Sequence, residues 1–167
     1  MRVTSTGIID GVIQDRYGKR GELYDFGMPA CSMPLEFHDA PEGTKTFAIF
    51  LEDKDAYPVS GGFAWVHWLA ANIEDAALPE DASRTMRDAM VQGANSWTSM
   101  QGGSNPPARC SCYGGMACPD KGHLYEINVY ALDAALDLSD GFLLNDLFHA
   151  MDGHVLDHAV LKGWYEA

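Results

Sequence analysis

The sequence predicts a mainly β protein: a β-sandwich of two antiparallel sheets with a few short helices, forming a single domain over residues 1–167. Two observations carry this prediction. Three long apolar runs, Thr46–Asp53, Phe63–Ile73 and His123–Leu132, have the length and patterning of core strands. They lie far apart in the chain, and only one or two segments between and after them show a helical pattern. Strands of this kind pack as layers around one core.

The first thirty residues are broken by glycines and by Pro29, and they predict short strands and turns that wrap the core. Pro34–Phe37 is a candidate edge strand, and Ala40–Gly43 has the composition of a turn. Thr46–Asp53 is apolar on both faces for most of its length, which indicates a central strand.

In the run Phe63–Ile73, strict alternation predicts that Phe63, Trp65, His67 and Leu69 share one side and that Ala64, Val66, Trp68 and Ala70 share the other. Leu78–Val91 begins near a proline and contains good helix formers, so a short surface helix is expected there. Gln92–Pro107 is rich in Gly, Ser and Asn and is predicted to be a loop.

His123–Leu132 alternates as a strand, and the residues expected on one face are His123, Tyr125, Ile127, Val129 and Ala131. Ser139 or Asp140 is expected to cap a helix that runs to about Met151 and ends at Gly153. Its apolar stripe comprises Leu143, Leu144, Leu147, Phe148 and Met151. A final strand is expected over His154–Leu161.

Composition and charge narrow the function classes. Of the 167 residues 47% are hydrophobic and 21% are charged, as in ordinary globular proteins, and no apolar run has membrane-spanning length. We therefore expect a cytoplasmic protein. The net charge of −13 repels nucleic acid and anionic lipid, so neither is an expected partner. Any anion site must be local, built from amides and imidazoles.

The four cysteines are Cys31, Cys110, Cys112 and Cys118. Thiolates with the nearby His123 would suit zinc, but the C-x-C and C-x₅ spacings differ from those of usual zinc sites. A disulfide is a second interpretation, and reduced packing or loop cysteines are the preferred one. No metal and no cofactor is predicted.

Asp53, His67 and His123 each lie on or at the end of an otherwise apolar strand face. A buried carboxylate needs a partner, and an Asp–His pair would raise the imidazole pKa. The loop Tyr113–Tyr125 adds the amides of Gly114 and Gly115, which we expect to hold the oxygens of a small anion. Trp65, Tyr125 and Pro119 would wall this pocket.

A nucleophilic enzyme is the alternative reading of these histidines. It requires a serine or cysteine beside one of them, and the candidates by type are Ser96, Ser99, Ser104 and Cys118. The pattern Gly-x-Ser-x-Gly is absent from the sequence. No catalytic residue is predicted, although Cys118 with His123 remains open as a hydrolase pair.

The order of several motifs resembles the phosphatidylethanolamine-binding protein family, in particular its bacterial Raf kinase inhibitor-like branch. Glu52–Pro58 resembles the family's Asp-Pro-Asp-Ala-Pro motif, and Trp65–Trp68 resembles its Trp-x-His-Trp strand. Tyr113-Gly114-Gly115 through Pro119 and then His123–Tyr125 resemble its glycine-proline loop and His-Arg-Tyr. Gln92–Trp97 and Gly153–Leu156 resemble features of the bacterial branch. The resemblance covers roughly Ile8 to Tyr165, and Leu124 stands where the family has arginine.

The resemblance implies the β-sandwich fold and a small cavity that accepts phosphate, acetate-like anions or a phosphoethanolamine headgroup. The predicted ligand-binding residues are Asp53, Asp55, Trp65, His67, Gly114, Gly115, Pro119, His123 and Tyr125. The function expected first is a non-catalytic binding module for a small anion or a phosphate-containing headgroup. An inhibitory regulator of a kinase or protease, contacting that partner through a loop such as Gln92–Pro107, is the alternative, and a homodimer is left open.

Overall fold

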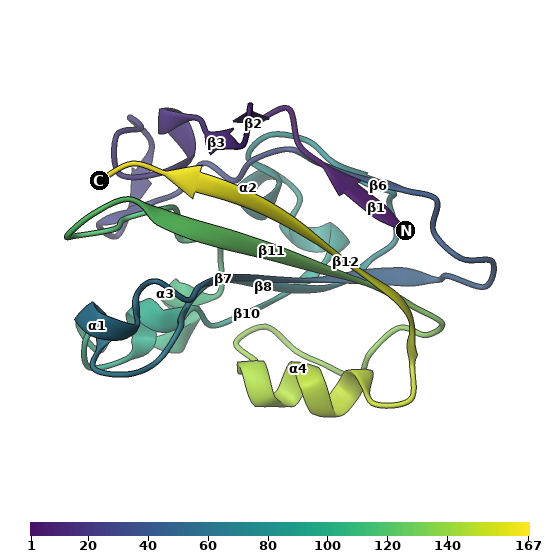
Figure 1. The fold of residues 1–167 in the computed structure, drawn as a ribbon. Coiled ribbons are helices and arrows are strands. Elements are labelled where there is room, and N and C mark those ends of the chain that lie inside the picture. The colour runs from purple at the N-terminus through teal and green to yellow at the C-terminus, as the bar shows by residue number, and fades with distance from the viewer.

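The computed structural model describes all residues 1–167 and has two main sheets, a short hairpin and a few short helices (Figure 1). The prediction of a mainly β fold is confirmed. The large sheet has seven strands in the spatial order β10 (Val91–Gly93), β8 (Trp65–Ile73), β7 (Thr46–Asp53), β11 (His123–Leu132), β12 (Val155–Tyr165), β3 (Val12–Ile13) and β2 (Ile8–Ile9). Its pairs are antiparallel except β12 with β3, which are parallel through Trp164 and Val12.

A smaller antiparallel sheet has the order β1 (Arg2–Thr4), β6 (Leu35–His38) and β9 (Ala77–Leu78). The segment predicted as an edge strand, Pro34–Phe37, therefore supplies the middle strand of this sheet. The prediction was wrong because the two flanking strands are too short to show a periodic pattern. The N-terminal region adds a hairpin of β4 (Tyr24–Asp25) and β5 (Met28–Pro29).

The central strands match their predicted bounds because their sequences have no breaker residue. All eight residues of β7 are buried, as expected for a strand covered on both faces. β11 begins at His123 and ends at Leu132, as predicted, and its face from His123 to Ala131 is buried. β8 starts at Trp65 instead of Phe63, and β12 continues past the predicted end, Leu161, to Tyr165.

The helices are short. They comprise α1 (Tyr57–Ser60), α2 (Ala82–Thr85), α3 (Pro107–Cys110), α4 (Leu144–Met151) and the 3₁₀ turns η1 (Asp15–Tyr17), η2 (Arg87–Ala89) and η3 (Ser96–Thr98). With eight residues in α4, four in each of the other α-helices and three in each 3₁₀ turn, none could span a bilayer.

Two helix predictions need correction. The surface helix expected over Leu78–Val91 is divided among β9, α2, η2 and β10, and Ala82 and Ser83 are buried. The C-terminal helix begins at Leu144 instead of Ser139 or Asp140. Gly141, with a φ of 90°, interrupts the helical path, and the Asp146 carboxylate accepts the Leu143 N–H at 2.8 Å.

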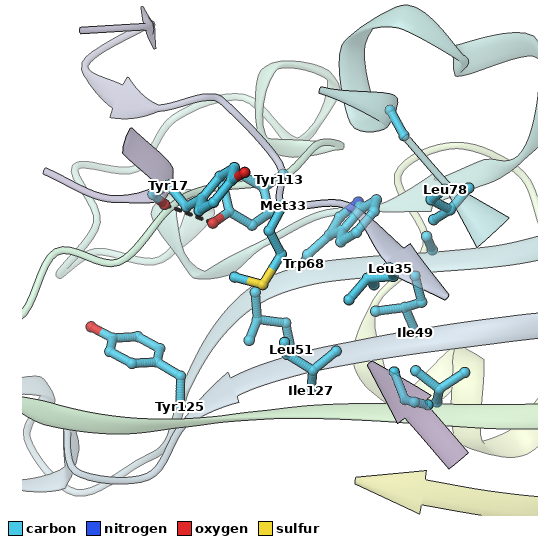
Figure 2. Packing of buried hydrophobic residues seen from close by; sticks show 14 of the residues in the cluster. Tyr17, Met33, Leu35, Ile49, Leu51, Trp68, Leu78, Tyr113, Tyr125 and Ile127 are labelled. Carbon is cyan, nitrogen blue, oxygen red and sulfur yellow. Dashed lines mark hydrogen bonds between the residues drawn. The ribbon is translucent and has the colours of Figure 1, made fainter. Parts of the chain in front are cut away.

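Two hydrophobic cores lie on opposite faces of the large sheet. The larger core lies between this sheet and the smaller one, and Figure 2 shows Met33 reaching toward Leu51 of β7. The second core lies under α4, which contributes Leu147 and Met151. Figure 1 shows α4 on the side of the large sheet opposite to β1 and β6. The large sheet is therefore the middle layer of the molecule.

A β-bulge in β8 changes the predicted alternation. Leu51 pairs with Trp68 while the next residue of β7, Glu52, pairs with Val66, so His67 is the extra residue. Trp68 belongs to the larger core, whereas Val66 and Leu69 contact the core under α4. The expected shared face of His67 and Leu69 is therefore wrong, and the bulge aims His67 toward the larger core, at the end where Tyr125 lies.

Candidate functional site

A cavity of about 300 Å³ opens where β7 ends and β8 begins, next to the loop that leads into β11. Four predicted site residues line it: Asp53, Trp65, His67 and Pro119. The other lining residues come from α1, from the turn around η3 and from the loop before Pro119. They are Ala56, Val59, Ser60, Trp97, Gln101, Gly102, Ala117 and Cys118.

His67 is the central polar group of the cavity, and only 2% of its surface is exposed. Its Nδ1 lies 2.7 Å from the carbonyl oxygen of Gly114, which can only accept, so Nδ1 carries the hydrogen. Its Nε2 makes no hydrogen bond within the chain. Burial lowers the pKa of His67 and outweighs the opposing charge of Asp53. The expectation that pairing with Asp53 raises the pKa is therefore wrong for this histidine.

Asp53, which lines the cavity, forms a buried pair with His123. Asp53 is 3% exposed and His123 is fully buried. The Asp53 carboxylate accepts from His123 Nδ1 at 2.7 Å and from the Ala56 N–H at 3.1 Å. The other ring nitrogen of His123 lies 2.9 Å from the Asp120 carboxylate. Both ring nitrogens of His123 are therefore bonded within the chain, and neither is free for a ligand.

Both predicted glycines serve packing and not anion binding. The Gly114 N–H donates to the His67 carbonyl, and the Gly115 N–H donates to the Pro29 carbonyl, each at 2.8 Å. A Cβ on Gly114 would lie 2.6 Å from the Trp97 ring. One on Gly115 would lie 2.3 Å from the Tyr17 carbonyl oxygen. The expected pair of free amide donors is therefore absent, because both amides complete the main-chain hydrogen bonding of the loop.

Aromatic rings hold His67 from two sides. Its ring centroid lies 5.1 Å from that of Tyr125 and 5.4 Å from that of Trp97, both in edge-to-face geometry. Tyr125 is fully buried and lies behind His67, so it does not line the cavity as expected. Figure 2 shows it at one end of the larger core. Burial and the charge of Asp53 raise its pKa well above the ordinary value.

Asp55 lies outside the cavity. Its carboxylate accepts the Leu124 N–H at 2.9 Å and so ties the turn after β7 to the start of β11. Trp97 lines the cavity but was not among the predicted ligand-binding residues, although it ends the motif Gln92–Trp97 that resembles the family. The contributions of α1 and of Gln101 depend on tertiary contacts and have no local signal.

The proposed Cys118–His123 pair does not form. The Cys118 thiol lies against the carbonyl oxygens of Tyr165 and Glu166, at 3.6 and 3.4 Å, and both His123 nitrogens bond to carboxylates. Burial raises the pKa of Cys118, which keeps the thiol protonated. All four cysteines are free thiols, and no serine hydroxyl contacts a histidine.

The comparisons with known proteins identify the family. The family described as phosphatidylethanolamine-binding protein matches residues 4–166. An uncharacterized protein of Bacillus subtilis, YxkA, is 47% identical over 148 residues, covering 86% of this chain and 88% of that protein. A UPF0098 protein of Methanothermobacter thermautotrophicus is 35% identical, covering 93% of this chain and 91% of that protein.

Solved structures agree. A homologue from Chlamydia trachomatis, CT736, described as a putative phosphatidylethanolamine-binding protein, has a TM-score of 0.79 at 30% identity and covers 99% of this chain and 97% of its own. Escherichia coli YbcL, described as a new member of the mammalian family, has a TM-score of 0.75 at 28% identity, covering 99% of this chain and 98% of its own. The chain belongs to the phosphatidylethanolamine-binding protein family.

Proposed function

We propose that this protein is a non-catalytic binding module whose cavity takes a small, proton-bearing oxyanion such as hydrogen phosphate or a phosphate monoester headgroup. The observation that carries the proposal is His67, a buried histidine whose Nε2 lacks a partner in the chain and lies on a residue that lines the cavity. Since this nitrogen has no hydrogen-bond partner in the chain, a bound group that donates a hydrogen bond to it stabilises the complex.

The charges around the cavity favour a ligand that brings a hydrogen. Asp53 is hydrogen-bonded to His123, and the lowered pKa of His67 keeps its ring neutral at pH 7, so its Nε2 can accept a hydrogen bond. Hydrogen phosphate and phosphate monoesters near neutral pH retain a proton in part of their population and can donate to that nitrogen. The indole N–H of Trp65 is buried without an acceptor and offers a donor for another ligand oxygen.

The absence of an activated nucleophile supports binding over turnover. The Cys118 thiol and the serine hydroxyls near the cavity, including Ser60 and Ser96, bond to main-chain groups. None of them faces a histidine that could act as a general base.

Calorimetric titration at pH 7 with inorganic phosphate and with phosphoethanolamine tests the proposal. We expect His67→Gln to weaken binding about tenfold, since a hydrogen bond to a charged ligand is removed. The exposed His149, on α4, provides a matched control, and His149→Gln should bind as the wild type does. Equal affinity in wild type and His67→Gln would overturn the assignment of this cavity.

A protein partner that contacts the loop around η3 is the second candidate, and it retains the interpretation of a kinase or protease regulator. Met100 is 85% exposed, and the next two residues, Gln101 and Gly102, line the cavity. A partner that binds Met100 would therefore touch the wall of the ligand site. Met100→Ser should reduce capture of such a partner from the host lysate while phosphate affinity is unchanged. Identical partner profiles for both proteins would contradict this candidate.

A further inference from the structure

A second cavity, of about 150 Å³, lies between the β4–β5 hairpin and the segments of α2, η2 and α3. Basic residues outnumber acidic ones in its lining, whereas acidic residues outnumber basic ones in the whole chain. Three of the 11 Lys and Arg residues line it, Arg84, Arg87 and Arg109, but only one of the 24 acidic residues, Asp25. In a protein of net charge −13, this is a local basic site.

Two of these arginines have guanidinium groups without a carboxylate partner. Arg87 donates from Nη2 to the Ser111 carbonyl at 3.2 Å, and the Arg109 guanidinium lies 4.1 Å from the centroid of the Phe26 ring. Arg84 is paired with Asp81 at 3.3 Å. A guanidinium carries five N–H donors, so Arg87 and Arg109 retain most of theirs for a ligand.

Phe26 holds Arg109 from a strained position. It lies at the hairpin turn with a φ of 46°, in the left-handed region that bulky residues rarely adopt, and it is 55% exposed. The two-residue turn Phe26-Gly27 between β4 and β5 accounts for this conformation, because such hairpin turns have positive φ at both residues. The exposed ring lies against the Arg109 guanidinium, and a cation over an aromatic face is held in a defined orientation.

We propose that this arginine cavity binds a single sulfate- or phosphate-sized oxyanion, free or as the end of a small ester. The volume of about 150 Å³ accommodates one such ion with a few waters, since a water molecule occupies about 30 Å³ in the liquid. Arg87 and Arg109 supply N–H donors from two sides. Burial raises the pKa of the Cys112 thiol in the wall to about 11, so this group adds no negative charge.

Sulfate distinguishes this cavity from the one around His67, because sulfate carries no proton at pH 7 and cannot donate to Nε2. Calorimetric titration with sodium sulfate at low ionic strength should show one site in the wild type and the same affinity in His67→Gln. Arg87→Gln and Arg109→Gln should each weaken sulfate binding about tenfold. Arg2→Gln removes the same charge from β1, outside the cavity, and should change the sulfate affinity by less than about twofold.

A substitution of Asp25 is expected to tighten sulfate binding, an effect that misfolding cannot produce. If the ligand is an anion, Asp25→Asn removes a repulsive charge and tightens sulfate binding. Weaker or unchanged binding in Asp25→Asn, or full affinity in both arginine variants, would overturn the proposal. Loss of sulfate binding in His67→Gln alone would assign sulfate to the first cavity and overturn the arginine site. It would also contradict the requirement for a proton-bearing ligand at His67, whereas the phosphate titration tests binding at that cavity separately.

To distinguish the free ion from the end of an ester, phosphate and phosphoethanolamine are compared in the His67→Gln background. Equal affinities for phosphate and phosphoethanolamine support recognition of the oxyanion itself. If neither of the two ligands binds, the extension of the proposal from sulfate to phosphate is overturned.

Discussion

At the scale of single residues, the two histidines of the site have opposite environments although both are buried on strands of one sheet. His123 is bonded on both sides by carboxylates, whereas His67 is bonded on one side by a carbonyl and is open on the other. The first arrangement leaves no ring nitrogen free, whereas the second leaves Nε2 without a partner in the chain. The two residues therefore have different positions: His123 is paired with Asp53, and His67 lines the cavity.

The buried pair predicts a large effect on stability. His123→Ala should lower the free energy of unfolding by about 3–5 kcal/mol, because Asp53 is left as a buried carboxyl group without its hydrogen-bond partner. His154 pairs with Asp133 at 2.8 Å, but both side chains are 46% exposed. His154→Ala should therefore lower the free energy of unfolding by less than about 1 kcal/mol. Urea unfolding at pH 7 measures both, and equal losses would contradict the role assigned to the buried pair.

His67 predicts a pH dependence of stability. Its pKa in the folded state lies below the ordinary value of 6.5, so below that pH the unfolded chain binds more protons. The stabilisation is present above the ordinary pKa and is lost as the pH falls toward the folded-state value. A difference of one bound proton between the unfolded and the folded state contributes at most about 1.4 kcal/mol per pH unit to the slope of the free energy of unfolding against pH.

Urea unfolding between pH 7 and pH 5 measures this slope. The wild type and His149→Gln should lose stability more steeply than His67→Gln, whose side chain does not titrate. Asp53 and His123 face His67 in every variant, so their contribution is common to all. Parallel curves for wild type and His67→Gln would contradict the assignment of a buried neutral ring.

At the scale of elements, the glycine loop shows that a motif can be correctly located and its chemistry misjudged. Gly114 and Gly115 lie beside the cavity, but their amides complete main-chain hydrogen bonds and their missing Cβ atoms make room for Trp97 and Tyr17. A pair of glycines predicts close approach of something to the backbone, and only the packing decides whether that is a ligand or a side chain.

Gly114→Ala tests this packing role, because its backbone is not in the left-handed region and the new methyl meets only the Trp97 ring and its surroundings. We expect the free energy of unfolding to fall by about 1–3 kcal/mol from overpacking. The double variant Gly114→Ala/Trp97→Leu should be less destabilised than the sum of the two single variants. Strict additivity in urea unfolding would show that the two positions are not coupled.

The helix α4 gives a similar lesson about patterns. The predicted stripe of five apolar residues is correct for Leu147 and Met151, which are buried under the large sheet. Leu143 and Phe148 are 46% and 43% exposed, because the helix starts later than predicted and covers only part of that sheet face. Periodicity identifies the helix, but its first turn depends on Gly141 and Asp146.

At the scale of the whole molecule, the net charge of −13 governs the long-range electrostatic interaction of the protein with lipid membranes. We expect anionic leaflets to repel the protein, and only three of its 11 Lys and Arg residues gather at the arginine cavity. The family's name therefore does not by itself predict membrane association for this chain.

Flotation with vesicles of phosphatidylethanolamine and phosphatidylglycerol checks this. We expect the protein to stay in the soluble fraction at 50 mM and at 150 mM salt, since electrostatic repulsion acts at both concentrations and salt only weakens it. Control vesicles of phosphatidylcholine should give the same result. Co-flotation that is strong at low salt and lost at high salt would indicate an attractive basic surface and contradict the prediction.

The sequence by itself determined the mainly β class, the bounds of β7 and β11, and the choice of Asp53, His67 and His123 as candidate site residues. These depend on local patterns: uninterrupted apolar runs, and polar groups placed within them. Only the tertiary structure decided which of these groups can meet a ligand. The bulge in β8 turned His67 toward the cavity, Asp120 enclosed His123, and main-chain hydrogen bonds occupied the amides of Gly114 and Gly115. Hydrogen bonds and packing between distant segments made each of these choices, and such contacts leave no periodic signal in the chain.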